Sequence, residues 1–565
     1  MSQFVITKQD SSNSVDVKGF ARLYGSAGYC LFVKGNYIVR NNDAGGVDIL
    51  LGVALFDGCR VDKVNFAQLD FGRESLAKLS GRFIVISVIE LEVQIISSIF
   101  GSFPCFMSPD CGVISSNQRL ISQATDGKLS MNALRERIVY YTNYKHSLFE
   151  GVRRLEAGVV ANVKDSNYSE YNYLSSVIKC QSNLSLENAI KGIKNKMEAN
   201  ARAYFTGGRK ASVSYTGGRD SRLLLCQLLR VMPVEQIHTF TVGYENDLEY
   251  FVGDKFTRKF KVEHDLLVPE LINTSHISEY VNQYENINFP CLYKDQVRQY
   301  LETKDVDVLN SNTPETVLCH LDYFEGQDHP AVNFVRKRRS IFEGRALGRN
   351  EKLANDVENA AVTKWKALRK NLPTDISANI LFSLTTIQRD WAFNILRPFD
   401  LAANTVCIME DPEIISILSS IDRSIFLDDN LYQILVKKEY PELHVTPTTR
   451  DIGFDIFKKM KVLDVVKNIP LIFKASVFAG SLSKLLKNNK SFIVNYCRDN
   501  QDMLVTIFGR EDAEALLHKL DAGVYLDNRF SKLLNKILFR KKTIREYELI
   551  TPLCAIALLN NNYYE

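Results

Sequence analysis

The sequence predicts a chain of mixed class, α+β in its first third and α/β beyond, and three observations lead to this prediction. Short runs of β-branched and aromatic residues, separated by turn residues, fill the chain up to about residue 165. From about residue 184 the apolar residues recur at helical spacing. Between residues 211 and 231 a β-prone run, a glycine-rich turn and a helical pattern follow one another directly, as in α/β domains.

Length and composition limit the classes of protein that fit. The 565 residues are enough for two or three domains, which we expect at residues 1–180, 181–455 and 456–565. The net charge of +4 is too small to indicate a nucleic-acid partner, and 11 cysteines without a C-x-x-C pair indicate neither a zinc site nor a disulfide framework. The start has no signal-peptide pattern, and the apolar stretch 83–100 carries Glu90 and Glu92, which favours buried strands over a membrane span. We therefore expect a cytoplasmic protein without a membrane partner.

The secondary-structure elements are expected in two groups. In the first third, strands are predicted at residues 29–33, 47–51, 82–89, 92–97 and 159–163. Further on, helices are predicted at 185–204, 250–260 and 413–420, and strands at 211–215, 237–242, 262–266 and 306–309. Because strands and helices alternate there, a doubly wound parallel sheet is expected, with its ligand at the carboxyl ends of the strands.

The turn after the run 211–215 has the composition of a phosphate-binding loop. Its residues are Thr216, Gly217, Gly218, Arg219, Asp220 and Ser221. Glycines allow close backbone approach, a helix start offers free N–H groups, and a carboxylate at residue 220 can hold magnesium. A plain Gly-Gly turn capped by Asp220 is the simpler alternative.

This loop resembles the PP-loop, S-G-G-x-D-S, of the ATP-pyrophosphatases, and its surroundings resemble the synthetase domain of asparagine synthetases. The resemblance implies that Phe240, Thr241, Val242 and Gly243 lie along the adenine and ribose of ATP. It also places a metal carboxylate at Glu315, beside Asp220, and a phosphate-facing catalytic cation at Arg450. The family's glycines near residue 315 are missing, which leaves a catalytically degenerate protein as an alternative. For His264 we expect a structural role, and for Arg397 and Asp400 a buried ion pair that fixes the Pro398 turn.

The first third resembles the class II glutamine amidotransferase domain of the same family, an Ntn-type α-β-β-α sandwich. The resemblance rests on LSGRFIV at 79–85, FGSFP at 100–104 and LFEGVRRL at 148–155. The family's nucleophile is an N-terminal cysteine, whereas Ser2 follows Met1 here, and the family's arginine-aspartate pair is replaced by Ser98 and Ile99. A hydroxyl is a far weaker nucleophile than a thiolate near neutral pH. We therefore predict a structural domain without glutaminase activity.

The remaining residues, 456–565, have a helical pattern. A lysine-rich run at 458–490 is typical of a solvated helical face, with a docking surface for an acidic peptide or carrier as the alternative.

Together these features predict an ATP- and Mg²⁺-dependent ligase that activates a carboxylate as an acyl-adenylate and passes it to an amine. Without a glutaminase, the resemblance points to members such as β-lactam synthetases and lasso-peptide macrolactam cyclases. The expected substrate is a small molecule or a peptide, with a partner protein of the same pathway left open. An ammonia-using asparagine synthetase-like enzyme and a non-catalytic ATP-binding scaffold are the two alternatives.

Overall fold

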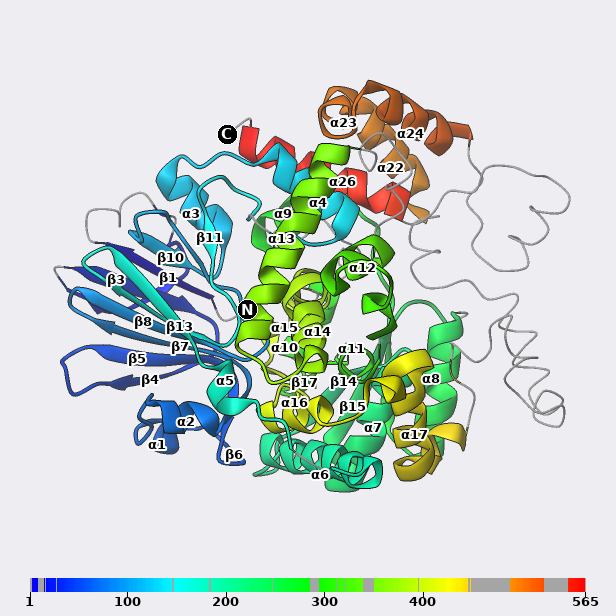
Figure 1. Ribbon diagram of the computed structural model, residues 1–565. Coiled ribbons are helices and arrows are strands. Elements are labelled where there is room, and N and C mark those ends of the chain that lie inside the picture. The colour runs from blue at the N-terminus through cyan, green and yellow to red at the C-terminus, as the bar shows by residue number, and fades with distance from the viewer. Residues whose placement is uncertain are drawn as a thin grey trace, which may run out of the picture.

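The structure is a computed structural model. It describes residues 3–445, 448, 488–522 and 547–563, apart from 9–14, 16, 27, 145–146, 182–183, 246, 285–293, 312, 320, 339–349 and 395. Within these residues the fold is mixed α/β, with two antiparallel sheets, one parallel sheet and many helices. The chain starts in the antiparallel sheets, passes into the parallel sheet, and ends in a group of helices (Figure 1).

Two antiparallel sheets form a sandwich in the first part of the chain, seen in blue and cyan in Figure 1. One has the order β11-β9-β10-β1-β3-β2, and the other has the order β13-β12-β8-β7-β5-β4, with β6 paired to β5. The strands are β1 (Gln3–Lys8), β2 (Ala21–Gly25), β3 (Tyr29–Lys34), β4 (Tyr37–Asn41), β5 (Val47–Phe56), β6 (Cys59–Arg60), β7 (Leu79–Ile89), β8 (Glu92–Ser97), β9 (Phe106–Met107), β10 (Val113–Ser115), β11 (Arg153–Arg154), β12 (Val159–Lys164) and β13 (Asn167–Asn172). The five strands expected here are all present.

Alternation of side chains explains how the sandwich holds together. In β1, Phe4 and Ile6 enter the core between the two sheets, whereas Val5 belongs to the core on the opposite face. In β7 the same alternation sends Ile84 and Ile86 inward and Val85 to the other side. Both faces are therefore buried, and this accounts for the nearly continuous apolar run of β7.

The second part of the chain is built on a parallel sheet of five strands in the order β16-β15-β14-β17-β18. Its strands are β14 (Ala211–Ser214), β15 (Ile237–Val242), β16 (Glu263–Leu267), β17 (Asp307–Leu309) and β18 (Thr405–Val406). The strands expected from the sequence match these to within one residue at each end. The exception is β18, a strand of two residues, which is too short to give a periodic signal.

Helices surround this sheet and fill the space between it and the sandwich (Figure 1). They are α1 (Lys63–Phe66), α2 (Arg73–Ala77), α3 (Gln118–Thr125), α4 (Met131–Tyr140), α5 (Leu174–Val177), α6 (Leu186–Tyr204), α7 (Arg219–Val231), α8 (Leu248–Lys259), α9 (Thr274–Tyr284), α10 (Lys294–Glu302), α11 (Pro314–Leu318), α12 (Pro330–Lys337), α13 (Glu351–Lys370), α14 (Asp375–Ser383), α15 (Phe399–Ala402), α16 (Pro412–Ser419) and α17 (Asn430–Glu439), with short 3-10 turns η2 (Val234–Gln236), η3 (Leu321–Phe324), η6 (Arg423–Asp429) and η7 (Pro441–Val445) and a π-helix, η5 (Leu384–Phe393).

Local caps set the helix starts. Ser185 accepts a hydrogen bond from the Asn188 amide and begins α6, as expected. Helix α8 begins two residues before the expected residue 250. The reason is that Asp247 takes the N-cap position, while its carboxylate closes the preceding turn by accepting from the Tyr244 amide at 2.6 Å.

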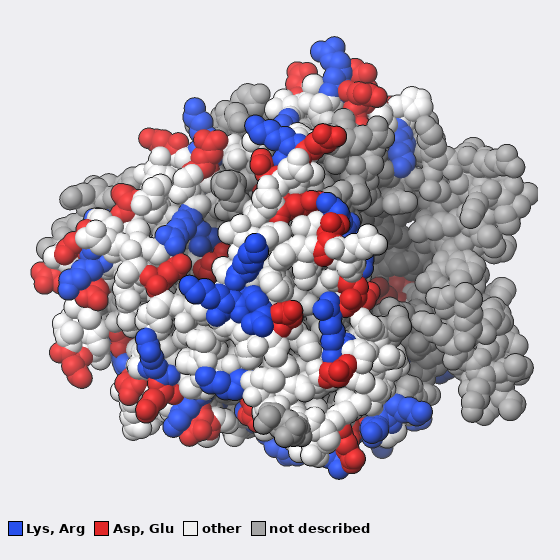
Figure 2. All heavy atoms as spheres, viewed as in Figure 1, with Lys and Arg blue, Asp and Glu red and all other residues white. Residues whose placement is uncertain are grey.

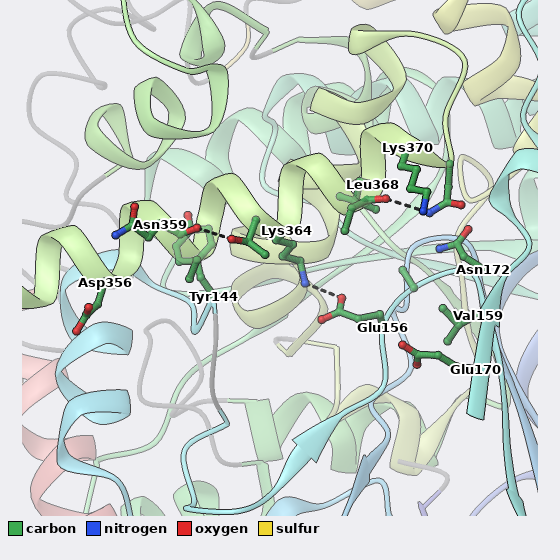
Figure 3. Close-up of a pocket in the computed structure, with 15 residues that line it drawn as sticks. Tyr144, Glu156, Val159, Glu170, Asn172, Asp356, Asn359, Lys364, Leu368 and Lys370 are labelled. Carbon is green, nitrogen blue, oxygen red and sulfur yellow. Dashed lines mark hydrogen bonds and ion pairs between the residues drawn. The ribbon is translucent and has the colours of Figure 1, made fainter. Parts of the chain in front are cut away.

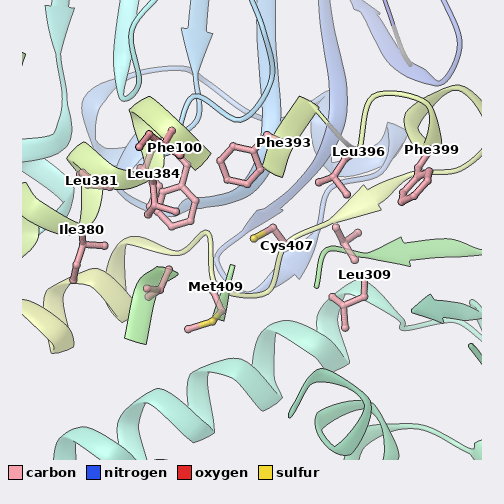
Figure 4. Close-up of a cluster of buried hydrophobic side chains, with 14 of the residues drawn as sticks. Phe100, Leu309, Ile380, Leu381, Leu384, Phe393, Leu396, Phe399, Cys407 and Met409 are labelled. Carbon is pink, nitrogen blue, oxygen red and sulfur yellow. The ribbon is translucent and has the colours of Figure 1, made fainter. Parts of the chain in front are cut away.

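The sandwich and the α/β unit share a continuous apolar core. Phe100 of the sandwich stacks on Phe393 of η5, with ring centroids 6.5 Å apart, amid side chains from α14, β17 and the segment after β18 (Figure 4). Since burial of apolar surface is the main favourable term in folding, this contact makes the two units one structural body.

The predicted ion pair between Arg397 and Asp400 is wrong, because Asp400 pairs with a different arginine. Asp400 is buried, but its carboxylate accepts two hydrogen bonds, at 2.6 and 2.8 Å, from Arg82 of β7 and so forms an ion pair across the two units. Arg397 instead donates to the carbonyl of Ser116 at 3.4 Å. Sequence proximity suggested a local pair, whereas the tertiary fold brings in a distant arginine.

The described part of the last 110 residues is helical, as expected, with α22 (Lys490–Asp499), α23 (Gln501–Phe508), α24 (Arg510–Ala522) and α26 (Tyr547–Tyr563). Positive and negative side chains are mixed over the face seen in Figure 2, in keeping with the near-neutral composition. Within the described ranges, every helix is too short or too polar to cross a bilayer.

Candidate nucleotide site

The predicted phosphate loop lies where the parallel sheet reverses its strand order. Strand β14 is central, with β15 and then β16 on one side and β17 and then β18 on the other. The chain leaves β14 through α7 toward β15, and reaches β17 only after β16, α9 and α10. In open α/β sheets the crevice at such a reversal, beyond the carboxyl ends of the strands, is where ligands bind. The loop at 215–218 occupies this place.

The conformation of the loop requires glycine at residue 217. Gly217 has φ of +65°, a region that residues with a Cβ avoid. A Cβ at this position would lie 2.7 Å from Val252 Cγ1 and 3.0 Å from the Gly253 amide nitrogen, both on α8. Close packing of the loop on α8 therefore depends on the missing side chain.

Helix α7 starts directly after the loop and offers its N-terminus. Gly218 occupies the N-cap position and brings no side chain to cap the first turn, which holds Arg219, Asp220 and Ser221. The amides of such a turn have no acceptor within the helix, so they attract an anion. Ser221 is 4% exposed, and among the described residues its hydroxyl oxygen has no hydrogen-bond partner. A buried hydroxyl in that state is available to donate a hydrogen bond to a polar ligand.

Two arginines beside the loop have different surroundings. Arg222 is buried and donates to the carbonyls of Gly217 and Leu443, each at 3.2 Å, while its guanidinium lies 4.6 Å from the centre of the Phe256 ring. Arg222 therefore lies in the protein interior and not on the surface. Arg219 lies over the Tyr432 ring at 4.9 Å, and the Tyr432 hydroxyl donates to the Arg219 carbonyl. Arg222 thus supports the loop from the protein interior through its hydrogen bond to the Gly217 carbonyl.

The residues assigned to adenine and ribose divide into two pairs. Phe240 is fully buried against the rings of Tyr300 and Phe399, and Thr241 is also buried and donates to the carbonyl of Tyr215. Val242 is half-buried, and the Gly243 amide donates to the Leu267 carbonyl at 2.9 Å. A nucleotide would meet this strand at its end, through Val242 and Gly243, rather than through the Phe240 ring. The role of all four residues stays a prediction.

His264 has the contacts of a structural residue, as expected. Its ring nitrogens lie 2.9 Å from Thr239 Oγ1 and 3.3 Å from Thr241 Oγ1, and its ring stacks on Tyr250 with centroids 5.4 Å apart. Burial lowers the pKa of His264 to about 4, with nearby aspartates opposing the shift. The imidazole is therefore neutral near pH 7 and ties β16 to β15.

The metal and catalytic assignments stay predictions. Asp220 lies in the first turn of α7, and Glu315 lies in the first turn of α11, which follows β17, the strand next to β14. The backbone thus places both at the same edge of the sheet, while the Glu315 side chain lies outside the described residues. Arg450 and the lysine-rich run up to residue 487 also lie outside them. Among the described residues there is no group of three or more metal-ligating His, Cys, Asp or Glu side chains.

Sequence reasoning missed the residues that support the loop from α8. Gly253 faces Tyr215 and His264, and a Cβ there would lie 3.2 and 3.3 Å from their ring atoms. A glycine inside a predicted helix was the available signal, because it costs helix stability unless close packing needs it.

Comparison with known proteins gives little further information. No protein-family model and no curated protein matches the chain. Among solved structures, the NAD⁺ synthetase from Acinetobacter baumannii is 14% identical with a TM-score of 0.18, over 30% of this chain and 32% of that one. The NH₃-dependent NAD synthetase from Campylobacter jejuni is 16% identical with a TM-score of 0.19, over 33% and 97% of the two chains. Glutamine phosphoribosylpyrophosphate amidotransferase from B. subtilis is 11% identical with a TM-score of 0.22, over 55% and 75%.

This chain spans about a third of the length of the A. baumannii synthetase. TM-scores this low carry no argument about fold or function, so function has to be argued from the site itself.

Proposed function

We propose that the protein is an ATP-dependent, AMP-forming amide ligase of the asparagine synthetase type. The observation that carries the proposal is the loop at 216–221, at the strand reversal of the parallel sheet. There a glycine with positive φ, an uncapped helix start and the buried Ser221 hydroxyl come together. These are the features that hold a pyrophosphate group.

The chemistry follows from what such a loop stabilises. A substrate carboxylate attacks the α-phosphorus of ATP, the α–β phosphoanhydride bond breaks, and pyrophosphate leaves as the acyl-adenylate forms. The amides of the first turn of α7 and the Ser221 hydroxyl would stabilise charge on the departing pyrophosphate. An amine then attacks the acyl carbon and AMP leaves.

Magnesium fits the donor set of the proposed site in part. Hard cations prefer carboxylate and hydroxyl oxygens, and Asp220 and Ser221 are adjacent in the first turn of α7. We assign Asp220 as the residue that would hold the ion, with Glu315 as its proposed second carboxylate. The bound ion supplies neutralisation of the phosphate charge. Arg450 is the proposed cation on the substrate side.

The source of the amine is the second part of the proposal. We propose that the sandwich is structural and that the amine comes from the substrate, as in macrolactam or lactam formation on a peptide or small molecule, because Ser98 and Ile99 stand at the place of the family's arginine-aspartate pair. Cys30 of the sandwich is 3% exposed within β3 and receives a hydrogen bond from Arg22. Burial of this kind leaves the thiol no access to a glutamine substrate.

The test is binding and turnover of ATP by the full chain. ATP binding is measured by calorimetry with Mg²⁺, and release of AMP and pyrophosphate is followed with candidate carboxylates. Asp220→Ala is expected to weaken ATP binding at least tenfold, because it removes a ligand of the ion and a hydrogen-bonding group of the first turn.

The matched control is Glu235→Ala, which removes an exposed carboxylate beyond the opposite end of α7. Its ATP binding is expected to equal that of the parent protein. Absence of ATP binding to the parent protein, or equal binding by both variants, refutes the proposal. Glutamine hydrolysis above background refutes the structural role of the sandwich.

A further inference from the structure

A cavity lies away from the loop, between helix α13 and the edge of the sandwich formed by β12 and β13. Its volume is about 700 Å³, within the range of small-molecule sites. Figure 3 shows Lys364 reaching from α13 toward Glu156, with Glu170 and Asn172 of β13 on the opposite wall. The cavity therefore combines side chains from both units of the chain.

The inner wall of the cavity is occupied by one ion pair. Lys364 Nζ lies 2.6 Å from Glu156 Oε2. The two partners differ in accessibility, because the Lys364 side chain is 10% exposed and the Glu156 side chain is 47% exposed. The carboxylate therefore lies at the border of the solvent, whereas the ammonium group lies at the inner wall.

Behind this pair, the described residues carry more positive than negative side chains. Asp390, on the π-helix η5, is fully buried and pairs with Arg154 at 2.6 Å, Arg389 at 3.2 Å and Arg137 at 3.4 Å. Arg389 also lies 3.9 Å from Glu156. Counted over the part of the chain that the structure describes, four cations, with Lys364 included, face Asp390 and Glu156. A further buried carboxylate, Glu136, accepts hydrogen bonds from Asn143 and Tyr144, and burial raises its pKa to about 7.

Two of these cations have lowered pKa values. Burial, with repulsion from Arg389, lowers the pKa of Lys364 to about 8 and that of Arg154 to about 9, although Glu156 and Asp390 oppose these shifts. A carboxylate held against Lys364 stabilises the ammonium charge at this wall, as Glu156 does in the structure.

The other lining residues of the cavity suit the uncharged part of a ligand that carries a carboxylate. Tyr144 lines the cavity and is 6% exposed, and among the described residues its hydroxyl has no hydrogen-bond partner. Ala360, Ala367 and Leu368 of α13 supply an apolar strip along the wall. A polar head at Lys364 and an apolar body along α13 would fill both kinds of surface.

We propose that this cavity is a binding site for a ligand that carries a carboxylate on a short apolar body. The ligand carboxylate takes the place of Glu156 on Lys364, and Glu156 moves into solvent. The chemistry is shared by a free organic acid and by the carboxyl end of a peptide. The site is separate from the ATP loop, so it does not rest on the proposed function.

The test uses two probes that represent the two sources, hexanoate and the dipeptide Ala-Leu, each compared with its neutral amide. Binding to the full chain is measured by ligand-observed NMR titration. Both carboxylates, or one of them, are expected to bind at least ~10-fold more tightly than their amides, the size of one charge-assisted contact. The probe that binds more tightly identifies the source.

Two variants give the diagnostic result. Lys364→Met is expected to weaken carboxylate binding ~10-fold or more, whereas Glu156→Gln is expected to strengthen it several-fold because the internal competitor loses its charge. Lys370→Met, which removes an exposed cation at another point of the lining, is the matched control and should change little. A merely structural ion pair predicts no gain in Glu156→Gln. Absence of saturable binding in both the parent chain and Glu156→Gln, or equal binding of amides and carboxylates, overturns the proposal.

Discussion

Substitution of Gly217 by alanine tests the claim that the loop conformation depends on a missing side chain. Alanine at φ of +65° costs about 1–2 kcal/mol of backbone strain. The added Cβ would also meet Val252 Cγ1 at 2.7 Å and the Gly253 nitrogen at 3.0 Å, and overpacking of this kind costs about 1–3 kcal/mol. Gly217→Ala should therefore lower the free energy of unfolding by about 2–5 kcal/mol.

A matched control isolates the steric part. Gly207, a few residues before β14, has φ of +72°, but a Cβ there would have nothing within 4 Å. Gly207→Ala should cost about 1–2 kcal/mol of the same backbone strain, less a few tenths from the stiffer unfolded chain. The difference between the two variants, about 1–3 kcal/mol, measures the packing of the loop on α8.

The assay is urea-induced unfolding followed by circular dichroism, together with ATP titration. ATP binding should weaken in Gly217→Ala and remain unchanged in Gly207→Ala. Equal stability losses in the two variants would refute the reasoning, because they would mean that the loop does not rest on α8.

Three further predictions concern buried charges. Asp400→Asn should cost about 3–5 kcal/mol, since it leaves Arg82 buried without its counter-charge, and urea unfolding that shows a loss below about 1 kcal/mol would contradict this. The folded-state pKa of His264, about 4, lies below its ordinary 6.5, so the unfolded chain binds the extra proton between these values. Stability should therefore fall by about 3 kcal/mol more in the parent chain than in His264→Gln as the pH drops from 6.5 to 4, and parallel pH curves would exclude the assignment. Burial raises the pKa of Glu410 from 4.5 to about 7, so its effect has the opposite sign. Stability present below pH 4.5 should be lost as the pH rises through 7, by about 3 kcal/mol relative to Glu410→Gln, which unfolding at pH 5 and pH 8 would reveal.

Regular elements with a strong local signal were predictable. Strand β15 was expected at its observed residues, and α6 within one residue of its start, because alternation and a serine cap are local properties. Strand β18, with two residues, carries no period that a sequence pattern can reveal.

Only the part of the candidate site that lies in one continuous loop could be predicted from the sequence. The glycines and Asp220 stand together in the sequence, so the loop could be recognised, and its position at the carboxyl end of β14 followed from the strand–turn–helix order. The support from α8 could not be recognised, because Val252 and Gly253 meet Gly217 only in the tertiary fold. The burial of Arg222 could not be recognised for the same reason. Its burial depends on Leu443, more than 200 residues away.

The pair between Arg82 and Asp400 has a consequence for the synthesis of the chain. The two residues are separated by 318 positions in the sequence. The Gly81 amide likewise has a distant partner, the Glu410 carbonyl, to which it donates at 2.7 Å. At roughly 5–20 residues per second, β7 leaves the ribosome about 16–64 s before its partner. During that interval the guanidinium of Arg82 has to remain hydrated, and the end of the sandwich that faces the second unit cannot close. The sandwich is synthesised first, but it can be completed only after the second unit has been synthesised.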